Sequence, residues 1–185
     1  MYLFLAPLLI GFTLNSASAF TTFYSHHFGD KAGRLLCTIL RNVLGIPVWA
    51  IGYGMAVMAP PSQLYTSSLI SSVLAWLLMI SGGVIIIISL WSLRARAAAP
   101  SMRDTLVRHG LYAYIRHPLY TGMLLELAGL FLWVATLPML LACLLGVLWI
   151  MLQARFEELD LLQRLPAYRE YMQGVPRFLP NFKRL

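Results

Sequence analysis

The sequence predicts an all-α integral membrane protein, a bundle of about five transmembrane helices that ends in a helical hairpin and a cytoplasmic tail. Three observations lead to this fold class. Of the 185 residues, 59% are hydrophobic and only 11% are charged, and the mean hydropathy is +0.73. The apolar residues fall into stretches close to the ~20 residues with which a helix crosses the hydrocarbon layer. The positive charges lie in alternate loops between these stretches. A soluble domain of this size could not bury so much apolar surface.

Five apolar stretches can be marked along the chain. The first contains residues 16–19, which resemble a signal-peptidase site, but no basic residue precedes them, and we expect a retained span. The third is long enough to tilt or to extend beyond the bilayer. The last two are short and are joined only by residues 135–138, so they predict a tight helical hairpin. The stretches comprise residues 1–23, 39–59, 67–93, 119–137 and 139–154.

All fourteen Lys and Arg residues lie in three segments, and the other two loops have none. By the positive-inside rule the three basic segments face the cytoplasm, which places the N-terminus outside and the C-terminus inside. The net charge of +7 then reflects orientation and attraction to anionic headgroups, so it does not indicate nucleic acid as a partner. The fourteen residues are Lys31, Arg34 and Arg41, then Arg94, Arg96, Arg103, Arg108 and Arg116, and finally Arg155, Arg164, Arg169, Arg177, Lys183 and Arg184.

The cysteines and histidines predict neither a disulfide nor a metal site. Cys37 falls near the cytoplasmic face and Cys143 in the middle of a span, so the two are too far apart to pair. The four histidines show no spacing that is typical of metal ligands.

The segment of residues 110–122 combines tyrosines, a cation, a histidine and a helix-starting proline between two apolar spans. Pro118 suits the first turn of the fourth span, where its missing N–H costs nothing. The free N–H groups of that turn favour an anionic group such as a carboxylate, and Arg116 and His117 add donors in front of it. Alternatively, Arg116 anchors the helix to headgroups and His117 caps it.

A second charged cluster follows the last span. Arg155 and Glu158 are three residues apart and can pair on one helix face, whereas Glu157 points elsewhere. Two adjacent acids are unexpected where the chain otherwise concentrates positive charge. Acids that accept hydrogen bonds from a ligand's ammonium or ribose hydroxyls would account for them, and a solvated ion pair at the helix end is the alternative.

Glu126 is the only acidic residue inside a predicted span. It shares a helix face with Gly122 and Gly129, and we expect this face to point into the bundle. An intramembrane acid is a functional candidate by default, and a neutral, hydrogen-bonded structural role is the alternative. Glu126 lies nine residues beyond His117, about 13 Å deeper along a helix, which suits the wall of an acceptor channel.

The tail, residues 155–185, has apolar residues at helical spacing and three prolines. It predicts a short amphipathic helix, a break near Leu165 and Pro166, a second helix of a turn or two, and an extended end that packs back on the body.

Together these residues resemble the isoprenylcysteine carboxyl methyltransferase family and its relatives, the phospholipid N-methyltransferases. The resemblance covers residues 106–180. Its motifs, in order, are Gly110-x-Tyr112, Arg116-His-Pro-x-Tyr120-x-Gly122, Arg155-x-Glu157-Glu158-x-x-Leu161, and Tyr168-x-x-Tyr171 followed by Val175-Pro-Arg-Phe-Leu-Pro180.

The resemblance implies S-adenosylmethionine as the methyl donor, bound at the cytoplasmic face. Residues 1–185 would form one domain, in which 1–93 are scaffold helices and 94–185 are the cofactor-binding and catalytic half. His117, with Arg116 nearby, would hold the donor's carboxylate, and Arg155 would orient the substrate or the Glu pair. The implied site comprises Arg155 and Glu158 as catalytic residues; Gly110, Tyr112, Arg116, His117, Pro118, Tyr120, Glu157 and Glu158 as donor-binding residues; and Glu126 and Gly122 in the substrate channel.

The acceptor is expected to be a lipid, or a lipidated small molecule or protein C-terminus, that enters sideways from the bilayer. The carboxylate of an isoprenylcysteine-like substrate is favoured, because a carboxylate is itself the nucleophile and needs no base. A phospholipid amine is the first alternative and would need a base. A membrane reductase with a nicotinamide cofactor and a non-catalytic scaffold or transporter are the others.

Overall fold

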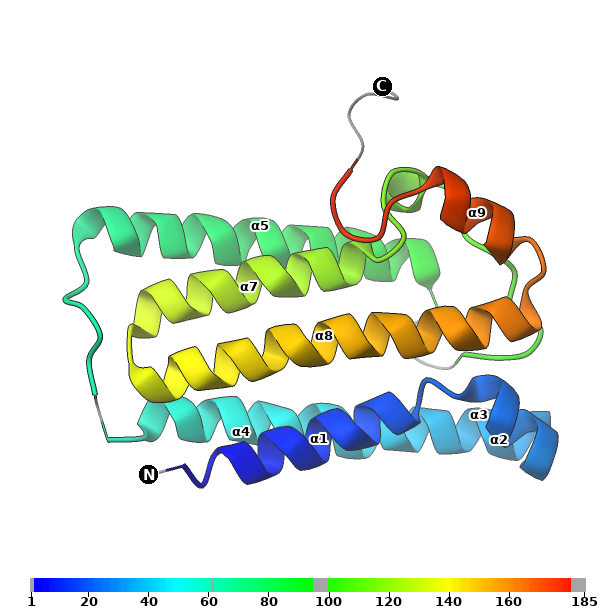
Figure 1. Ribbon diagram of the computed structural model, residues 1–185, viewed down its shortest axis with the longest axis horizontal. Coiled ribbons are helices and arrows are strands. Elements are labelled where there is room, and N and C mark those ends of the chain that lie inside the picture. The colour runs from blue at the N-terminus through cyan, green and yellow to red at the C-terminus, as the bar shows by residue number, and fades with distance from the viewer. Residues whose placement is uncertain (1, 61, 95–99, 181–185) are drawn as a thin grey trace.

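The computed structural model describes residues 2–60, 62–94 and 100–180, and within these ranges the regular secondary structure is helical apart from one isolated β-bridge (Figure 1). Arg96, Lys183 and Arg184 of the predicted basic segments lie outside the described residues. The elements in order are α1 (Leu5–Ala17), α2 (Thr21–Phe28), α3 (Asp30–Thr38), η1 (Ile39–Gly45), α4 (Ile46–Met58), α5 (Leu69–Leu93), η2 (Gly110–Ala113), α7 (Pro118–Val134), α8 (Leu137–Arg164) and α9 (Tyr168–Gly174).

Three helices in the described part of the chain are long and apolar enough to cross a membrane, where the sequence predicted about five spans. They are Asp30–Met58, which joins α3, η1 and α4, then α5 and α8. The apolar helices α1 and α7 have 13 and 17 residues, fewer than the ~20 that a perpendicular crossing needs. The first stretch is shorter than predicted because the helix ends at Ala17, where the Ser18 hydroxyl donates a hydrogen bond to the carbonyl of Asn15.

Within the long helix Asp30–Met58, residues 39–45 form a π-helical turn. The N–H of Ile46 bonds to the carbonyl of Arg41, five residues earlier. Pro47 follows directly, and because it lacks an N–H, the preceding turn loses one ordinary donor and can widen. Single π turns of this kind recur at functional sites.

Helices α5 and α7 pack closely through glycines. A Cβ added at Gly122 would lie 2.7 Å from the carbonyl oxygen of Gly82, and one at Gly129 would lie 2.7 Å from that of Ala75. Only residues without a large side chain allow two helix backbones to approach in this way. The face of α7 that carries Gly122, Glu126 and Gly129 is therefore directed into the bundle, as predicted.

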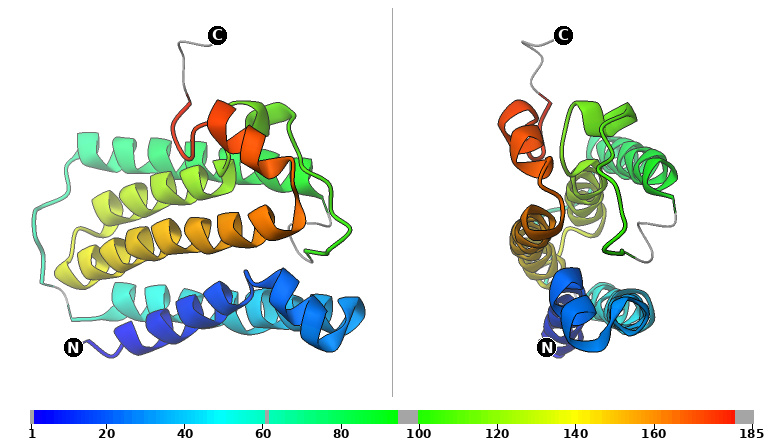
Figure 2. Two further views of the ribbon diagram at one scale, coloured as in Figure 1. Left: turned by 45° about the vertical axis from the view of Figure 1, so that its right-hand side comes forward. Right: turned by 90° about the vertical axis from the view of Figure 1, so that its right-hand side faces the viewer.

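Helix α8 lies between two groups of helices, α1 with α4 on one side and α5 with α7 on the other (Figure 2). Phe12 of α1 stacks on Trp149 of α8 with ring centroids 4.6 Å apart, and both belong to the apolar core. Thr136 caps α8 by accepting a hydrogen bond from the N–H of Met139, so α7 and α8 are joined only by Ala135 and Thr136. The long α8 forms one wall of the space between the two groups.

The tail follows its prediction. Helix α8 ends at Arg164, Leu165 and Pro166 interrupt the helix, and α9 is a short second helix. The chain then returns to the bundle, where the N–H groups of Arg116 and His117 donate to the carbonyls of Pro176 and Arg177. The tail is thereby fixed against the start of α7. In Figure 1, α9, α2 and α3 lie at the end of the bundle opposite to the N-terminus and the α7–α8 connection.

Candidate functional site

A cavity of about 620 Å³ opens between the two groups of helices, at the end that carries the tail. Its walls come from both halves of the chain, since α1, η1, α4 and α5 contribute as well as α7, α8 and the segment after residue 100. One part is polar and the other is apolar. The polar part includes Asn15, Thr21, Arg41, Asn42, Asp104, Tyr112, Arg116, His117, Tyr120, Glu157, Asp160 and Arg164, and the apolar part includes Ile46, Trp49, Ile86, Leu90, Leu119, Met123 and Trp149.

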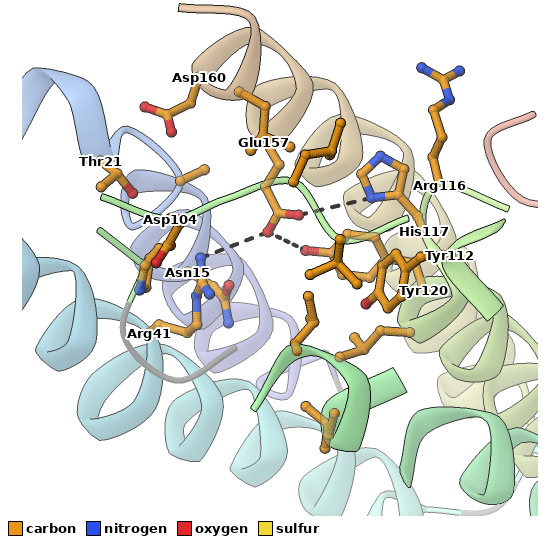
Figure 3. A pocket seen from close by; sticks show the side chains of 18 of the residues that line it. Asn15, Thr21, Arg41, Asp104, Tyr112, Arg116, His117, Tyr120, Glu157 and Asp160 are labelled. Carbon is orange, nitrogen blue, oxygen red and sulfur yellow. Dashed lines mark hydrogen bonds and ion pairs between the residues drawn. The ribbon is translucent and has the colours of Figure 1, made fainter. Parts of the chain in front are cut away.

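Glu157 occupies the centre of the polar part (Figure 3). The hydroxyl of Tyr120 donates to its Oε1 at 2.6 Å, and Nε2 of Gln153 donates to the same oxygen at 3.1 Å. A guanidinium nitrogen of Arg41 lies 3.8 Å from Oε1, and Nδ1 of His117 lies 4.0 Å from Oε2. These four contacts with Glu157 are called the cavity network below. They leave the carboxylate facing the cavity.

The neighbouring Glu158 faces away from the cavity and is fully buried, with 0% of its side chain exposed. Its carboxylate lies 3.0 Å from a guanidinium nitrogen of Arg116 and 3.2 Å from Nε2 of His117. Arg177 binds both oxygens, at 3.0 and 2.5 Å, and the hydrogen bond to Glu158 raises the pKa of Arg177. Arg116, His117 and Arg177 around Glu158 are called the buried network below. It ties α8 to the start of α7 and to the tail.

His117 belongs to both networks, because its two ring nitrogens approach Glu158 and Glu157. Its ring stacks on Tyr120, with centroids 5.5 Å apart and planes inclined by 25°. The residue occupies the N-cap position of α7, where its side chain makes no capping hydrogen bond, and Pro118 takes the first helical position. The backbone of His117 is held by the returning tail, so α7, α8 and the tail together fix the orientation of the ring.

Not all predicted site residues meet at the cavity. Arg155 is exposed and does not line it, and Glu158 pairs with Arg116 and Arg177 where the sequence suggested Arg155. Gly110, with φ of +61°, begins the turn η2. Gly122 lies in the α5–α7 contact.

Glu126 lines the cavity on the apolar side. A Cβ added at Gly82 of α5 would lie 2.9 Å from its Cγ, so the side chain fills the space that this glycine leaves. Its position confirms the predicted direction of this face of α7.

Sequence reasoning missed the residues that line the cavity from the N-terminal helices, chiefly Asn15, Thr21, Arg41 and Asn42. One signal was available. Asn15 is a polar residue inside the first apolar stretch, where every polar group needs a partner or a wet surface. Arg41 was counted in a basic loop, but it lies within a continuous helix and turns toward Glu157.

A third charged cluster, formed by Asp104, Asp160 and Arg164, also lines the cavity. Asp160 accepts from the N–H of Thr22 at 2.7 Å and from Nε of Arg164 at 2.8 Å. Arg164 also donates to the carbonyl of Ser101 at 2.8 Å and lies 3.5 Å from Asp104. Asp160, Arg164 and Asp104 therefore satisfy one another at this side of the cavity.

Comparison with known proteins assigns the fold of the second half of the chain to one family. The family model for phospholipid methyltransferases matches residues 70–168, more than half of the chain. The match covers nearly all of α5 and the whole of α7 and α8, and it ends at Tyr168, the first residue of the tail helix α9. Searches of the curated proteins and of the solved structures returned no significant match.

Proposed function

Because the chain belongs to the phospholipid methyltransferase family, we propose that it transfers a methyl group from S-adenosylmethionine to an acceptor embedded in the membrane. The observation that carries this proposal is the cavity, in which a polar part built largely on α7 and α8 continues into an apolar part. A hydrophilic donor and a lipidic acceptor need these two environments in direct contact. A volume of about 620 Å³ falls within the range of small-molecule sites, roughly 300–1,000 Å³.

The residues of the polar part match the charges of the proposed donor. Glu157 would accept hydrogen bonds from its ammonium group or ribose hydroxyls, and His117, backed by Arg116, would hold its carboxylate. Tyr112 and Tyr120 would place aromatic faces against the cationic sulfur. Burial raises the pKa of Tyr112, so its phenol stays neutral. When bound, S-adenosylmethionine supplies an already activated methyl group, so these side chains need only align the reactants and exclude water.

Glu158 is assigned a positioning role in this scheme. Its carboxylate is enclosed by Arg116, His117 and Arg177, so it acts on the donor through the orientation of His117. Arg155 is exposed on α8, and we assign it no contact with the donor. Gly110 and Pro118 shape the segment that carries Arg116 and His117.

The acceptor would reach the site sideways from the bilayer. Ile46 of α4 and Leu90 of α5 both line the apolar part of the cavity, and 38% and 41% of their surfaces are exposed. Apolar side chains that are exposed at the rim of a membrane cavity offer a route for acyl or prenyl chains.

The first candidate for the acceptor group is the carboxylate of an isoprenylcysteine-like substrate. A carboxylate is itself the nucleophile, so no residue of the cavity network has to act as a base. A phospholipid amine is the second candidate, favoured by the family match and by Glu126, a carboxylate in the cavity wall that could take the proton. The two candidates share the donor site and differ only in the group that receives the methyl.

The test uses the purified full-length protein in maltoside micelles. Calorimetry with S-adenosylmethionine measures donor binding, and radiolabelled donor with N-acetyl-S-farnesylcysteine or with phosphatidylethanolamine measures transfer. We expect donor binding and transfer to one of the two acceptors, and both should weaken in His117→Ala, where an anion ligand and the stacking partner of Tyr120 are lost. A folded protein that binds no donor and transfers no methyl group would contradict the proposal.

We also propose that the end of the bundle that carries the cavity and the tail faces the cytoplasm, and that the N-terminus lies outside. Introduced cysteines at Ser62 and Ser101, in a background in which Cys37 and Cys143 are replaced, should react with an impermeant maleimide from opposite sides of the membrane. Labelling of both from one side would contradict this orientation.

A further inference from the structure

Gln153 is a fully buried amide of α8. None of its surface is exposed, and among the described residues it is not one of those that line the cavity. It lies one helical turn before Glu157, and its Nε2 donates to Oε1 of that carboxylate at 3.1 Å. Side chains four residues apart lie on one face of a helix. The amide therefore reaches Glu157 from the packed interior and not from the cavity.

The other half of this amide has no partner. In the part of the chain that the structure describes, Oε1 of Gln153 is buried and accepts no hydrogen bond. Turning the amide over would place this oxygen against Oε1 of Glu157, a second acceptor. A buried acceptor without a partner costs stability, and an apolar side chain of similar volume would avoid this cost. The hydrogen bond to Glu157 is therefore what distinguishes the amide from an apolar residue.

Two hydrogen bonds converge on one oxygen of Glu157. Tyr120 of α7 donates to Oε1 at 2.6 Å, and Gln153 of α8 donates to the same atom. The last torsion of a glutamate side chain is otherwise broad, so a single hydrogen bond would let the carboxylate plane rotate. Donors from two helices restrict this rotation. They leave Oε2 on the side of His117, whose Nδ1 lies 4.0 Å away (Figure 3).

The position of Oε2 selects the group of the methyl donor that it meets. In the proposed function His117 holds the donor's carboxylate, and in an amino acid the carboxylate and the ammonium group are bound to the same carbon. With the carboxylate at His117, the ammonium group lies next to Oε2 of Glu157, whereas the ribose lies at the other end of the methionine chain. A hydrogen bond between ammonium and carboxylate is charge-assisted and depends on direction.

Resting on the proposed function, we infer that Gln153 is a positioning residue for the binding of S-adenosylmethionine. Together with Tyr120 it holds Oε1 of Glu157, so that Oε2 is directed at the ammonium group. Because the carboxylate is ordered before the ligand arrives, binding does not have to restrict this torsion. Gln153 itself does not touch the ligand and acts through Glu157.

The experiment measures binding to the purified full-length protein in maltoside micelles by calorimetry. The probes are S-adenosylhomocysteine and its deaminated analogue, in which hydrogen replaces the ammonium group. Gln153→Met keeps a similar volume and removes the hydrogen-bond donor. It should weaken binding of S-adenosylhomocysteine about threefold to tenfold, as expected for one hydrogen bond, and change binding of the deaminated analogue by less than about twofold. The unfolding midpoint without ligand should equal that of the wild type or rise, because the unpartnered oxygen is gone.

Further variants sharpen the result. In a Glu157→Gln background, Gln153→Met should have almost no further effect on S-adenosylhomocysteine, because both changes act on one contact. Gln163→Met is the matched control, since Gln163 is exposed on the same helix and does not line the cavity. Its binding constants for both probes should equal those of the wild type. Should Gln153→Met fail to fold, Gln153→Asn decides by the same ratio, because its shorter amide stays polar but withdraws the hydrogen-bond donor.

Three results would overturn the inference while the proposed function stands. Equal losses for the two probes show that Gln153 shapes the site without directing Oε2. Unchanged binding of both probes shows that Glu157 is oriented without the amide. An undiminished loss in the Glu157→Gln background shows that Gln153 acts by another route. A folded wild type that binds neither probe refutes the proposed function itself, and the inference with it.

Discussion

The cavity network and the buried network each contain one carboxylate of an adjacent pair, and they differ in how completely that carboxylate is satisfied. Around Glu158, Arg177 binds both oxygens and Arg116 and His117 add two more contacts, with no exposed surface. Around Glu157, one oxygen receives hydrogen bonds from Tyr120 and Gln153, and Arg41 and His117 lie 3.8 and 4.0 Å away. A saturated, buried group stabilises a structure, whereas a partly satisfied group at a cavity can bind a ligand.

The comparison also explains why two neighbouring acids have different surroundings. Successive residues of a helix point about 100° apart, so the rotation of α8 that turns Glu157 into the cavity turns Glu158 toward the tail. The tail reaches Glu158 because residues 176 and 177 pair with the backbone of Arg116 and His117. The buried network therefore fixes the position of His117, and His117 in turn contacts Glu157 in the cavity network.

The largest effect is expected for Glu158→Gln. The change leaves Arg116 and Arg177 without a counter-charge in a buried place, and breaking such a pair costs about 3 kcal/mol or more. Thermal unfolding in maltoside micelles should show a clearly lower midpoint, and donor affinity should fall with it. Glu170→Gln is the control, since the side chain of Glu170 is 83% exposed. If the two variants unfold at the same temperature, Glu158 does not hold the tail.

Glu157→Gln should separate binding from stability. The amide keeps the volume and one acceptor, but it loses the charge that would meet a cationic donor, and calorimetry should show affinity for S-adenosylmethionine weaker by about 1.5–3 kcal/mol. The unfolding midpoint should stay close to that of the wild type, because the carboxylate is only partly satisfied. A variant that unfolds early but binds normally would reverse the roles of the two networks.

A smaller effect is expected for Tyr120→Phe. The hydroxyl donates to Glu157 at 2.6 Å, and its loss removes one hydrogen bond to this carboxylate while the ring still stacks on His117. Donor affinity should fall by about 0.5–1.5 kcal/mol. A double variant with Glu157→Gln should lose less than the sum of the two single changes, because both act on one contact. Strict additivity would show that Tyr120 does not act through Glu157.

The sequence predicted what depends on local chemistry and missed what depends on packing. Hydropathy placed the apolar helices, and Pro166 together with the spacing of Tyr168 and Tyr171 predicted the broken tail. The rotation of α8, by contrast, is set by its packing against α1, α2, α4, α7 and α9, so no local pattern could tell which of Glu157 and Glu158 faces the cavity.

Arg41 and Asn15 illustrate the same limit on the N-terminal side. Hydropathy separates loops from spans, and it assigned Arg41 to a basic loop because charged residues are rare within membrane helices. The π turn before Pro47 and the gap left by Gly45 bring Arg41 and Asn15 to one point, and both depend on how α1 packs on η1.

Glu126→Gln is the substitution for which the smallest effect is expected. Glu126 belongs to neither network and lies on the apolar side of the cavity against Gly82, about 13 Å along α7 from His117. We propose that at this position it lines the path of the acceptor and does not reach the donor's methyl group. Donor affinity and most of the transfer rate should therefore be kept, as measured by calorimetry and with radiolabelled donor. If donor binding survives but transfer is abolished, Glu126 removes a proton from the acceptor. A carboxylate acceptor has no proton to lose, so that result would make a phospholipid amine the substrate.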